Sequence, residues 1–177
     1  NTCWRSIIDG SGLACDNNPR VGAADEHNWR PDQVASPKHI VVVGTGVAAL
    51  EAAHTAARRG HRVTVAGDDA QVGGKTWLHA GLPGGENLSS VYDYQYLMAK
   101  RHGCEFVLGR HATAEDVLAL QPDEVVLATG SRSGQPSWLS DEWAASGLIP
   151  SAREMAATLL ERNDMTEGRV VLVDQDH

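Results

Sequence analysis

The sequence predicts an α/β fold in which helices flank a parallel β-sheet. Short apolar runs alternate along the chain with segments of helical periodicity, and the first run, residues 40–43, is β-branched and apolar without interruption. Such a run is expected of a parallel strand that helices cover on both faces. Strands and helices that alternate in this way join into one parallel sheet through right-handed crossovers.

The strands are expected where apolar runs are bounded by turn residues. They are residues 40–43, 62–66, 105–108, 124–128 and 169–174. Three segments lack sustained periodicity, and we expect them to be irregular. They are a leader or linker over 1–38, a glycine-rich loop over 71–88, and a loop over 131–150.

The first helix follows from the spacing of apolar side chains. Val47, Leu50, His54 and Ala57 lie on one stripe of a helix over residues 47–59, with polar residues on another. Gly60 is well suited to end this helix. We interpret His54, on the core-facing stripe, as a hydrogen-bonded packing residue.

Capping signals mark the later helices. A helix over 90–102 is expected to be capped by Ser89 or Ser90. Thr113 with Asp116 matches a capping box that opens a brief helix through residue 120. Ser151 with Glu154 matches a second box, before a helix to about residue 162.

Composition excludes several classes of function. The net charge is −8, and residues 115–177 supply the acidic excess, so nucleic acid is not an expected partner. No apolar run is long enough to span a membrane and no signal peptide is evident, which predicts a cytoplasmic protein. The chain starts at Asn1 and stops just after an expected strand, so we expect it to be cut from a longer protein.

The strongest motif is the glycine turn after the first strand, Gly44-Thr45-Gly46-Val47-Ala48-Ala49, which matches G-x-G-x-x-A. Gly44 permits the tight turn, Gly46 lets backbone amides approach a pyrophosphate, and Ala49 lets the helix pack close to the strand. The free N–H groups at the helix N-terminus then face the phosphate charge. This βαβ context predicts a Rossmann-like nucleotide-binding site with Gly44, Thr45, Gly46, Val47 and Ala49 in contact with the ligand.

One position departs from this pattern. Such units usually place a carboxylate at the tip of the second strand to hold the ribose, and this chain has Gly67 there. Asp68 is the first candidate to replace that carboxylate and Asp69 a weaker one, while both could equally solvate a turn. Loss of the contact should cost about 1–3 kcal/mol, which weakens binding without abolishing the pyrophosphate site.

Two further segments point to the same crevice. Gly74 and Lys75 follow the second strand, where they either approach a phosphate or form a plain turn. An apolar strand runs into Ala128, Thr129 and Gly130, at the edge where open α/β sheets bind ligands.

Other reactive residues carry no catalytic signal. The eight histidines show no metal spacing, and no nucleophile and base are paired, so we assign no catalytic residue. The three cysteines are too few for a disulfide framework, and Cys104 is interpreted as inert. The five tryptophans are interpreted as packing or interface residues.

Four segments together resemble a known family. They are CWRSIIDGSGLACDNNPRVG, PKHIVVVGTGVAALEAAHTAARRGHRVTVAGDDAQVGGK, TAEDVLALQPDEVVLATGS and GRVVLVDQDH. In order and spacing they resemble the C-terminal nucleotide-binding portion of the trimethylamine dehydrogenase and 2,4-dienoyl-CoA reductase family. The resemblance implies a fold of the FAD/NAD(P)-binding type, truncated here.

The resemblance also implies cofactors and domains. Cys3 and Cys15 look like the third and fourth ligands of a 4Fe-4S cluster, and soft thiolates suit such clusters. Ala112 would lie near the adenine of FAD or ADP, and Ala128 to Gly130 would close the pocket. The implied domains are the tail of the cluster region and a linker (1–38), an ADP/FAD-binding domain (39–135), and the start of a second, incomplete nucleotide-binding domain (136–177).

The resemblance implies a part of a flavin and iron–sulfur oxidoreductase that acts on amines or enoyl thioesters. Its FMN-bearing catalytic barrel would be the main partner, absent from this chain, which would be inactive alone. An electron-transfer partner and an oligomer are further expectations. One alternative is an ADP-binding structural or regulatory module without redox chemistry; a more distant one, an S-adenosylmethionine-dependent methyltransferase, leaves Ala128 to Gly130 unexplained.

Overall fold

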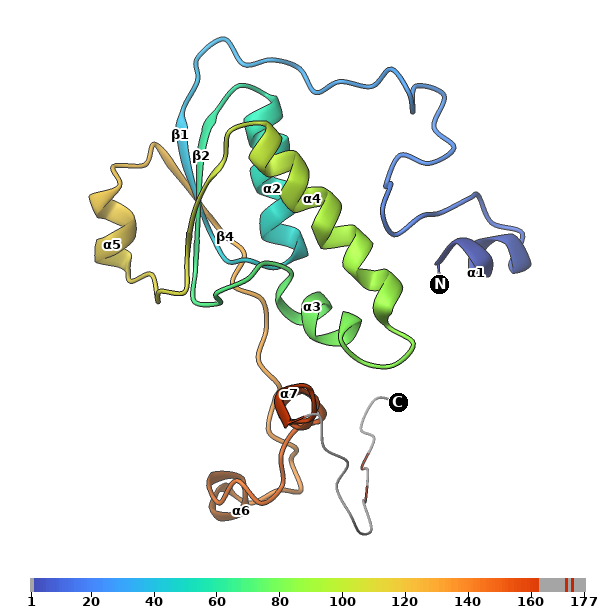
Figure 1. Ribbon diagram of the computed structural model, residues 1–177, viewed down its shortest axis with the longest axis vertical. Coiled ribbons are helices and arrows are strands. Elements are labelled where there is room, and N and C mark those ends of the chain that lie inside the picture. Colours follow the sequence, from blue (N-terminus) through green and yellow to red (C-terminus); the bar gives the residue numbers. More distant parts are fainter. Residues whose placement is uncertain (1, 163–170, 172, 174–177) are drawn as a thin grey trace.

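A computed structural model describes residues 2–162 together with 171 and 173 (Figure 1). Its centre is a four-stranded sheet in the order β3-β2-β1-β4, with all neighbours parallel. The strands are β1 (His39–Val43), β2 (Arg62–Gly67), β3 (Glu105–Leu108) and β4 (Glu124–Leu127). This confirms the predicted α/β fold, and the strand order is that of the first four strands of a doubly wound dinucleotide fold.

Helices cover the two faces of the sheet unequally. Helices α2 (Val47–Arg58) and α4 (Ser89–Arg101) pack on one face, and the short α5 (Ala114–Ala119) lies on the other (Figure 1). The crossovers β1-α2-β2 and β2-α4-β3 therefore place two helices side by side, and α5 connects β3 to β4 across the opposite face.

The main core lies between the sheet and the α2 and α4 pair. Val42, Val63 and Val65 pack against Ala49 and Ala53 of α2, and all five are at most 1% exposed. Alanines on the buried stripe let α2 approach the strands closely, as expected from the small residues of the glycine turn. The start of α2 is thereby fixed against the carboxyl end of β1.

A polar network joins the two helices at the edge of this core. Buried His54 shares a hydrogen bond with the Glu51 carboxylate at 3.0 Å, and Gln95 of α4 donates to the same oxygen at 3.0 Å. The hydrogen bond from His54 is the main reason that the pKa of Glu51 lies below its usual range. The interpretation of His54 as a hydrogen-bonded packing residue is confirmed.

Both predicted capping boxes are present. Asp116 N–H donates to the Thr113 hydroxyl and Thr113 N–H to the Asp116 carboxylate, at the start of α5. Ser151 and Glu154 make the same reciprocal pair before α7 (Ala152–Arg162). Backbone and side-chain hydrogen bonds from Ser151 hold the pKa of Glu154 below its usual range.

The three segments expected to be irregular each contain a short helix, so those expectations were wrong in part. The helices are α1 (Thr2–Ile8), α3 (Gly74–Ala80) with the 3₁₀ turn η1 (Glu86–Leu88), and α6 (Asp141–Ala145). They span two turns or less, too short to show a repeating periodicity. Neither Ser89 nor Ser90 caps α4, because η1 runs directly into it and Leu88 is the N-cap. The strand expected over 169–174 lies largely outside the described residues.

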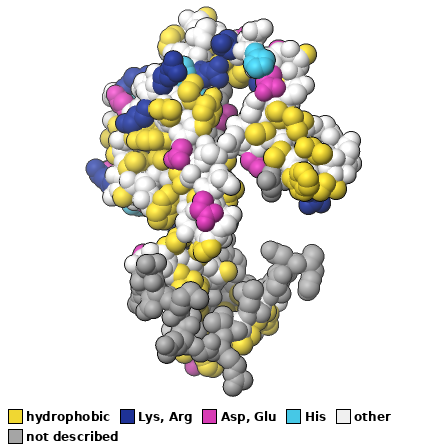
Figure 2. Space-filling view, turned by 45° about the vertical axis from the view of Figure 1, so that its right-hand side comes forward, with side chains coloured by type: hydrophobic (Ala, Val, Ile, Leu, Met, Phe, Trp, Pro, Cys, Tyr) yellow, Lys and Arg dark blue, Asp and Glu magenta, His cyan; other side chains and the backbone are white. Residues whose placement is uncertain are grey.

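Apolar side chains are exposed away from the sheet. Trp4, Ile7 and Ile8 are 64%, 61% and 65% exposed, and hydrophobic side chains gather on the lobe that carries α1 (Figure 2). Trp138 and Trp143 are each 53% exposed, so these tryptophans are not core residues. Within the described residues, no helix has both the length and the apolar character needed to cross a membrane.

Burial in the core changes the pKa and the reactivity of the Cys104 thiol. The thiol is 5% exposed and donates to the Ala53 carbonyl at 3.6 Å, and burial raises its pKa from 9.0 to about 11. We expect Cys104 to resist alkylation by iodoacetamide at pH 8 until urea unfolds the chain, as peptide mass mapping would detect. The pKa of Cys104 is higher in the folded chain than in the unfolded chain. The contribution of the protonated thiol to the free energy of unfolding is therefore fully present below pH 9.0 and is lost as pH rises through about 11. Rapid native alkylation at pH 8 would contradict this.

Candidate functional site

The turn from β1 into α2 lies at the carboxyl edge of the sheet. Gly44 has φ +129°, a conformation that side-chain-bearing residues rarely adopt, and a Cβ there would lie 2.2 Å from the Ala128 carbonyl oxygen. The Ala128 N–H donates to the Val43 carbonyl at 2.8 Å, so the end of β4 is tied to the end of β1. Glycine at position 44 is therefore required by the close approach of the two chains.

Gly46 faces open space. It is the N-cap of α2 with φ −75° and ψ 177°, and a Cβ added to it would meet no atom within 4 Å. The first turn of α2 contains no acidic residue, so no side chain there offsets the positive end of the helix dipole. This gives an opening in which backbone amides can face an anion.

A second glycine turn closes one side of this opening. The Gly73 N–H donates to the Thr45 carbonyl at 2.8 Å, and a Cβ on Gly74 would lie 3.1 Å from Gly46 Cα. The N-terminus of α3 therefore abuts the N-terminus of α2. The glycine pair after the second strand therefore lies directly against the turn from β1 into α2.

Lys75 lies at the meeting of this wall with the segment after β4. Its ammonium donates to the Ser131 hydroxyl, and its side chain passes beside Gly130, which has φ +78°. Thr129 lies between Gly130 and the Ala128 carbonyl that contacts Gly44. The predicted residues Gly44 to Val47, Gly74, Lys75 and 128–130 are thus brought together around one opening.

The tip of β2 is arranged around Gly67. A Cβ there would lie 2.5 Å from the Thr45 methyl group, so Thr45 occupies the space that a larger residue would need. The Thr45 hydroxyl donates to the Asp69 carboxylate at 3.1 Å. Asp68 instead pairs with His111 at 3.0 Å, with both side chains largely exposed. The two candidates for the ribose carboxylate therefore have different surroundings.

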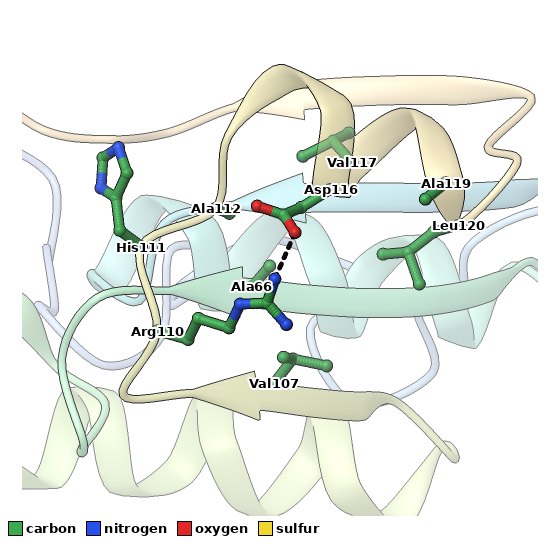
Figure 3. Close-up of a pocket in the computed structure, with 9 residues that line it drawn as sticks. All are labelled: Ala66, Val107, Arg110, His111, Ala112, Asp116, Val117, Ala119 and Leu120. Atoms are coloured by element: carbon green, nitrogen blue, oxygen red, sulfur yellow. Dashed lines mark hydrogen bonds and ion pairs between the residues drawn. The ribbon is translucent and has the colours of Figure 1, made fainter.

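A cavity of about 240 Å³ opens between α5 and strands β2 and β3 (Figure 3). Its apolar walls come from Ala66 on β2, Val107 on β3 and Val117 on α5. Ala112, the residue expected near the adenine, lines it as well. The cavity is lined mainly by apolar residues and adjoins the carboxyl end of β2.

Charged side chains frame the mouth of this cavity. Arg110 reaches across it to pair with Asp116, and His111 lines its edge (Figure 3). Hydrogen bonds from Thr113 lower the pKa of Asp116 below its usual range. Arg110 and His111 each have a carboxylate partner, Asp116 and Asp68.

The predicted cluster ligands lie far along the chain from this opening. Cys3 is exposed on α1, and Cys15 is half-buried in the segment that follows. Across residues 2–162, no three or more histidine, cysteine or acidic side chains are grouped to hold a metal ion. These residues supply at most two thiolates toward a cluster that needs four.

Several lining residues were not predicted from the sequence. They are Ala66, Val107, Arg110, His111, Asp116, Val117, Ala119 and Leu120. Their positions in the sequence could have identified them. They flank the carboxyl ends of β2 and β3 or lie on the crossover helix after β3, where open α/β sheets bind ligands.

The fold and the glycine turn define a dinucleotide-binding domain. The sequence model of the family described as pyridine nucleotide-disulphide oxidoreductase matches residues 38–173. The chain belongs to this family of oxidoreductases, and its relatives confirm the resemblance to the trimethylamine dehydrogenase and 2,4-dienoyl-CoA reductase group.

Three relatives illustrate the placement. The chain is 36% identical over 124 residues to an NADH oxidase of Thermoanaerobacter brockii, covering 70% of this chain and 19% of the relative. It is 32% identical over 168 residues to the N,N-dimethylglycine/sarcosine dehydrogenase of Chromohalobacter salexigens, covering 91% and 24%. The structure of histamine dehydrogenase from Rhizobium sp. 4-9 superposes with a TM-score of 0.69 at 26% identity, covering 89% and 24%. The chain thus spans about a quarter or less of these proteins.

The α5 cap supports the wall of the cavity. Thr113→Ala removes the hydroxyl that accepts from Asp116 N–H, and should lower the thermal midpoint by about 2–4 °C. Thr113→Ser, which keeps the hydroxyl, should retain the wild-type midpoint. Since the folded pKa of Asp116 is lowered, its stabilisation is present above the ordinary pKa and is lost as pH falls through the lowered value. Differential scanning calorimetry at pH 7 and pH 3 checks the effect of the substitution and the effect of pH. Equal thermal midpoints for Thr113→Ala and wild type at pH 7 would contradict the capping role of Thr113.

Proposed function

We propose that this chain binds FAD or ADP as the adenine-nucleotide domain of a multidomain flavin and iron–sulfur oxidoreductase. Residues 39–135 form the ADP/FAD-binding domain, residues 1–38 the tail of the cluster region with a linker, and residues 136–177 the start of a second nucleotide-binding domain. The pyrophosphate lies on the amides of the β1-α2 turn and the adenine in the cavity beside Ala112.

The observation that carries this proposal is the opening at Gly46. The segments at Gly44, Gly74 and Ala128 meet beside it, yet a Cβ on Gly46 would meet nothing within 4 Å, so open space lies in front of the helix N-terminus. Gly44, Gly73 and Gly74 make the convergence sterically possible. An uncompensated helix N-terminus facing such a space favours a diphosphate.

The residues present fit the adenine half of a dinucleotide. The turn supplies amides for the diphosphate, the apolar cavity supplies a stacking surface for a base, and the carboxylates after β2 supply acceptors for ribose hydroxyls. Lys75 adds a positive charge at the edge of the diphosphate opening. A flavin, when bound, supplies the electron-transfer chemistry, and this chain's residues hold and orient its adenine end.

The activity that we propose for the whole protein is inferred from its similarity to known oxidoreductases. A dimethylglycine/sarcosine dehydrogenase, a histamine dehydrogenase and a cinnamate reductase support a parent enzyme that takes electrons from amines or delivers them to conjugated acyl substrates such as enoyl thioesters. The reaction would take place at FMN in a separate barrel domain of the parent polypeptide. Cys3 and Cys15 would contribute two of the four thiolates of a 4Fe-4S cluster, whose other ligands must come from outside the described residues.

A second candidate is an ADP-binding module with a structural or regulatory role. The described cavity matches an adenine and is framed by the paired charges of Arg110 and Asp116, which favours the adenosine end of a ligand. ADP alone would satisfy every contact proposed for this chain.

Denaturing extraction of the purified chain, followed by chromatography and mass identification of the released nucleotide, tests the proposal. FAD with flavin absorbance supports the redox domain, and ADP without flavin absorbance supports the structural module. If the extract is empty and neither FAD nor ADP produces heat on calorimetric titration, both are refuted.

A further inference from the structure

We propose that Asp69, positioned by Thr45, holds the ribose in this chain in place of a carboxylate at the strand tip. The assignment rests on the proposed function and specifies which residue selects the adenosine. It differs from the sequence-based expectation, in which Asp68 was the first candidate.

Position 67 has no room for a side chain in this structure. Gly67 is buried, and a Cβ there would come within 2.5 Å of the Thr45 methyl group. Thr45 is 5% exposed and β-branched, so its side chain has little freedom to move aside. A glutamate at position 67 is therefore incompatible with the present place of Thr45, and the acidic function must come from another residue.

Asp69 is held by contacts from its side chain and its backbone. The Thr45 hydroxyl donates to one Asp69 carboxylate oxygen at 3.1 Å, which ties this carboxylate to the turn that faces the diphosphate. A carboxylate has about four acceptor sites, so one hydrogen bond leaves capacity for ribose hydroxyls. The Asp69 backbone is also fixed, because the Gly109 N–H donates to its carbonyl at 2.9 Å.

The neighbouring carboxylate, Asp68, has a different partner. Asp68 pairs with His111 at 3.0 Å, and the two side chains are 68% and 76% exposed. Such an exposed pair provides little positional restraint. Asp68 is thus engaged with the exposed His111 side chain, whereas Asp69 is tied through Thr45 to the turn from β1 into α2.

The chemistry of the ligand follows from these contacts. A carboxylate accepts hydrogen bonds from a free 2′,3′-diol, and it repels a phosphate ester at the 2′ position. At the cavity rim Arg110 pairs with Asp116 and His111 with Asp68, so each of these two side chains already has an acidic neighbour. The site therefore selects adenosine diphosphates with a free ribose diol and rejects 2′-phosphorylated ones.

Isothermal titration of the full chain with ADP, 2′,3′-dideoxy-ADP and 2′-phospho-ADP tests the assignment. Wild type should bind ADP about 10-fold more tightly than the dideoxy compound, because hydrogen bonds to a charged acceptor are lost. Asp69→Asn should reduce this preference to about 3-fold or less, and should weaken the discrimination against the 2′-phosphate.

Matched variants separate positioning from general structure. Asp68→Asn makes the same change in charge at the adjacent position and should keep the wild-type preference. Thr45→Val keeps the β-branched shape but loses the hydroxyl, and should reduce the preference in the same way as Asp69→Asn. Thr45→Ser restores the hydroxyl and should restore the preference, a rescue that loss of packing alone would not give.

The outcomes distinguish this assignment from the proposed function. If wild type binds ADP and Asp69→Asn keeps the full diol preference, or if Asp68→Asn alone removes it, the assignment to Asp69 is wrong while the nucleotide site stands. If wild type binds neither ADP nor FAD, the proposed function fails and the assignment fails with it. Circular dichroism spectra of all variants should match that of wild type, since Asp69 is exposed, Thr45→Val conserves volume and Thr45→Ser removes only one methyl group.

Discussion

Gly44→Ala is expected to destabilise the domain and to abolish nucleotide binding. The φ of +129° alone costs a non-glycine residue about 1–3 kcal/mol. The new Cβ would also lie 2.2 Å from the Ala128 carbonyl oxygen, a backbone atom held by the sheet, so β1 and β4 must separate at their carboxyl ends. Urea denaturation followed by circular dichroism should show the lower free energy of unfolding, and calorimetry should show no ADP binding.

Gly134→Ala is the matched control for this change. Position 134 has no strained backbone, and a Cβ there would meet nothing within 4 Å. The control should unfold within about 0.5 kcal/mol of wild type, as surface substitutions usually do. If Gly44→Ala were as stable as Gly134→Ala, the close packing of the turn against Ala128 would be wrong.

Gly46→Ala is expected to leave the fold intact and to weaken ADP binding at least about 10-fold. Its φ of −75° suits alanine, and the added methyl group meets no protein atom within 4 Å. The free energy of unfolding should therefore stay within about 1 kcal/mol of wild type. The methyl group would, however, occupy the space proposed for the diphosphate, which separates the amides from the ligand and costs at least one charge-assisted hydrogen bond.

The two measurements on Gly46→Ala must be made on the same preparation. Thermal unfolding gives the stability, and calorimetric titration with ADP gives the affinity. A variant that binds ADP as tightly as wild type would place the diphosphate elsewhere. A variant that is unfolded would contradict the open space seen at position 46.

The sequence predicted the sheet because its strands and long helices are set by local patterns. Residues 40–43, 62–66 and 105–108 are apolar runs with turn residues at their ends, and each forms a strand within one residue of the expected bounds. Residues 47–59 show helical periodicity over three turns and form α2. Two capping boxes were predicted because the box depends on side chains three residues apart.

Short helices and non-local contacts were not accessible in this way. Helix α3 spans seven residues, fewer than the two full turns that periodicity requires, and its place is fixed by the Gly73 N–H donating to Thr45. That contact joins residues 28 positions apart and leaves no local trace in the sequence. The glycine pair was visible, but its role as a wall of the opening was not.

The residue on the ribose side of the proposed site could not be chosen from the sequence alone either. The sequence revealed that Gly67 replaces a carboxylate, and it offered Asp68 and Asp69 as substitutes. Choosing between them requires the direction of each side chain, which depends on Thr45 and His111 from other elements. Cys3 and Cys15 likewise stay predicted ligands, because across residues 2–162 no three or more histidine, cysteine or acidic side chains are grouped to hold a metal ion.

The central claim is that the β1-α2 turn holds a diphosphate, and comparison of ADP with adenosine tests it most directly. Both share the base and the ribose diol, so the difference between their dissociation constants isolates the diphosphate. Calorimetric titration of the wild-type chain should give ADP at least about 10-fold tighter binding than adenosine, as expected for one or more charge-assisted hydrogen bonds. Equal affinities, or no binding of ADP, would contradict the claim.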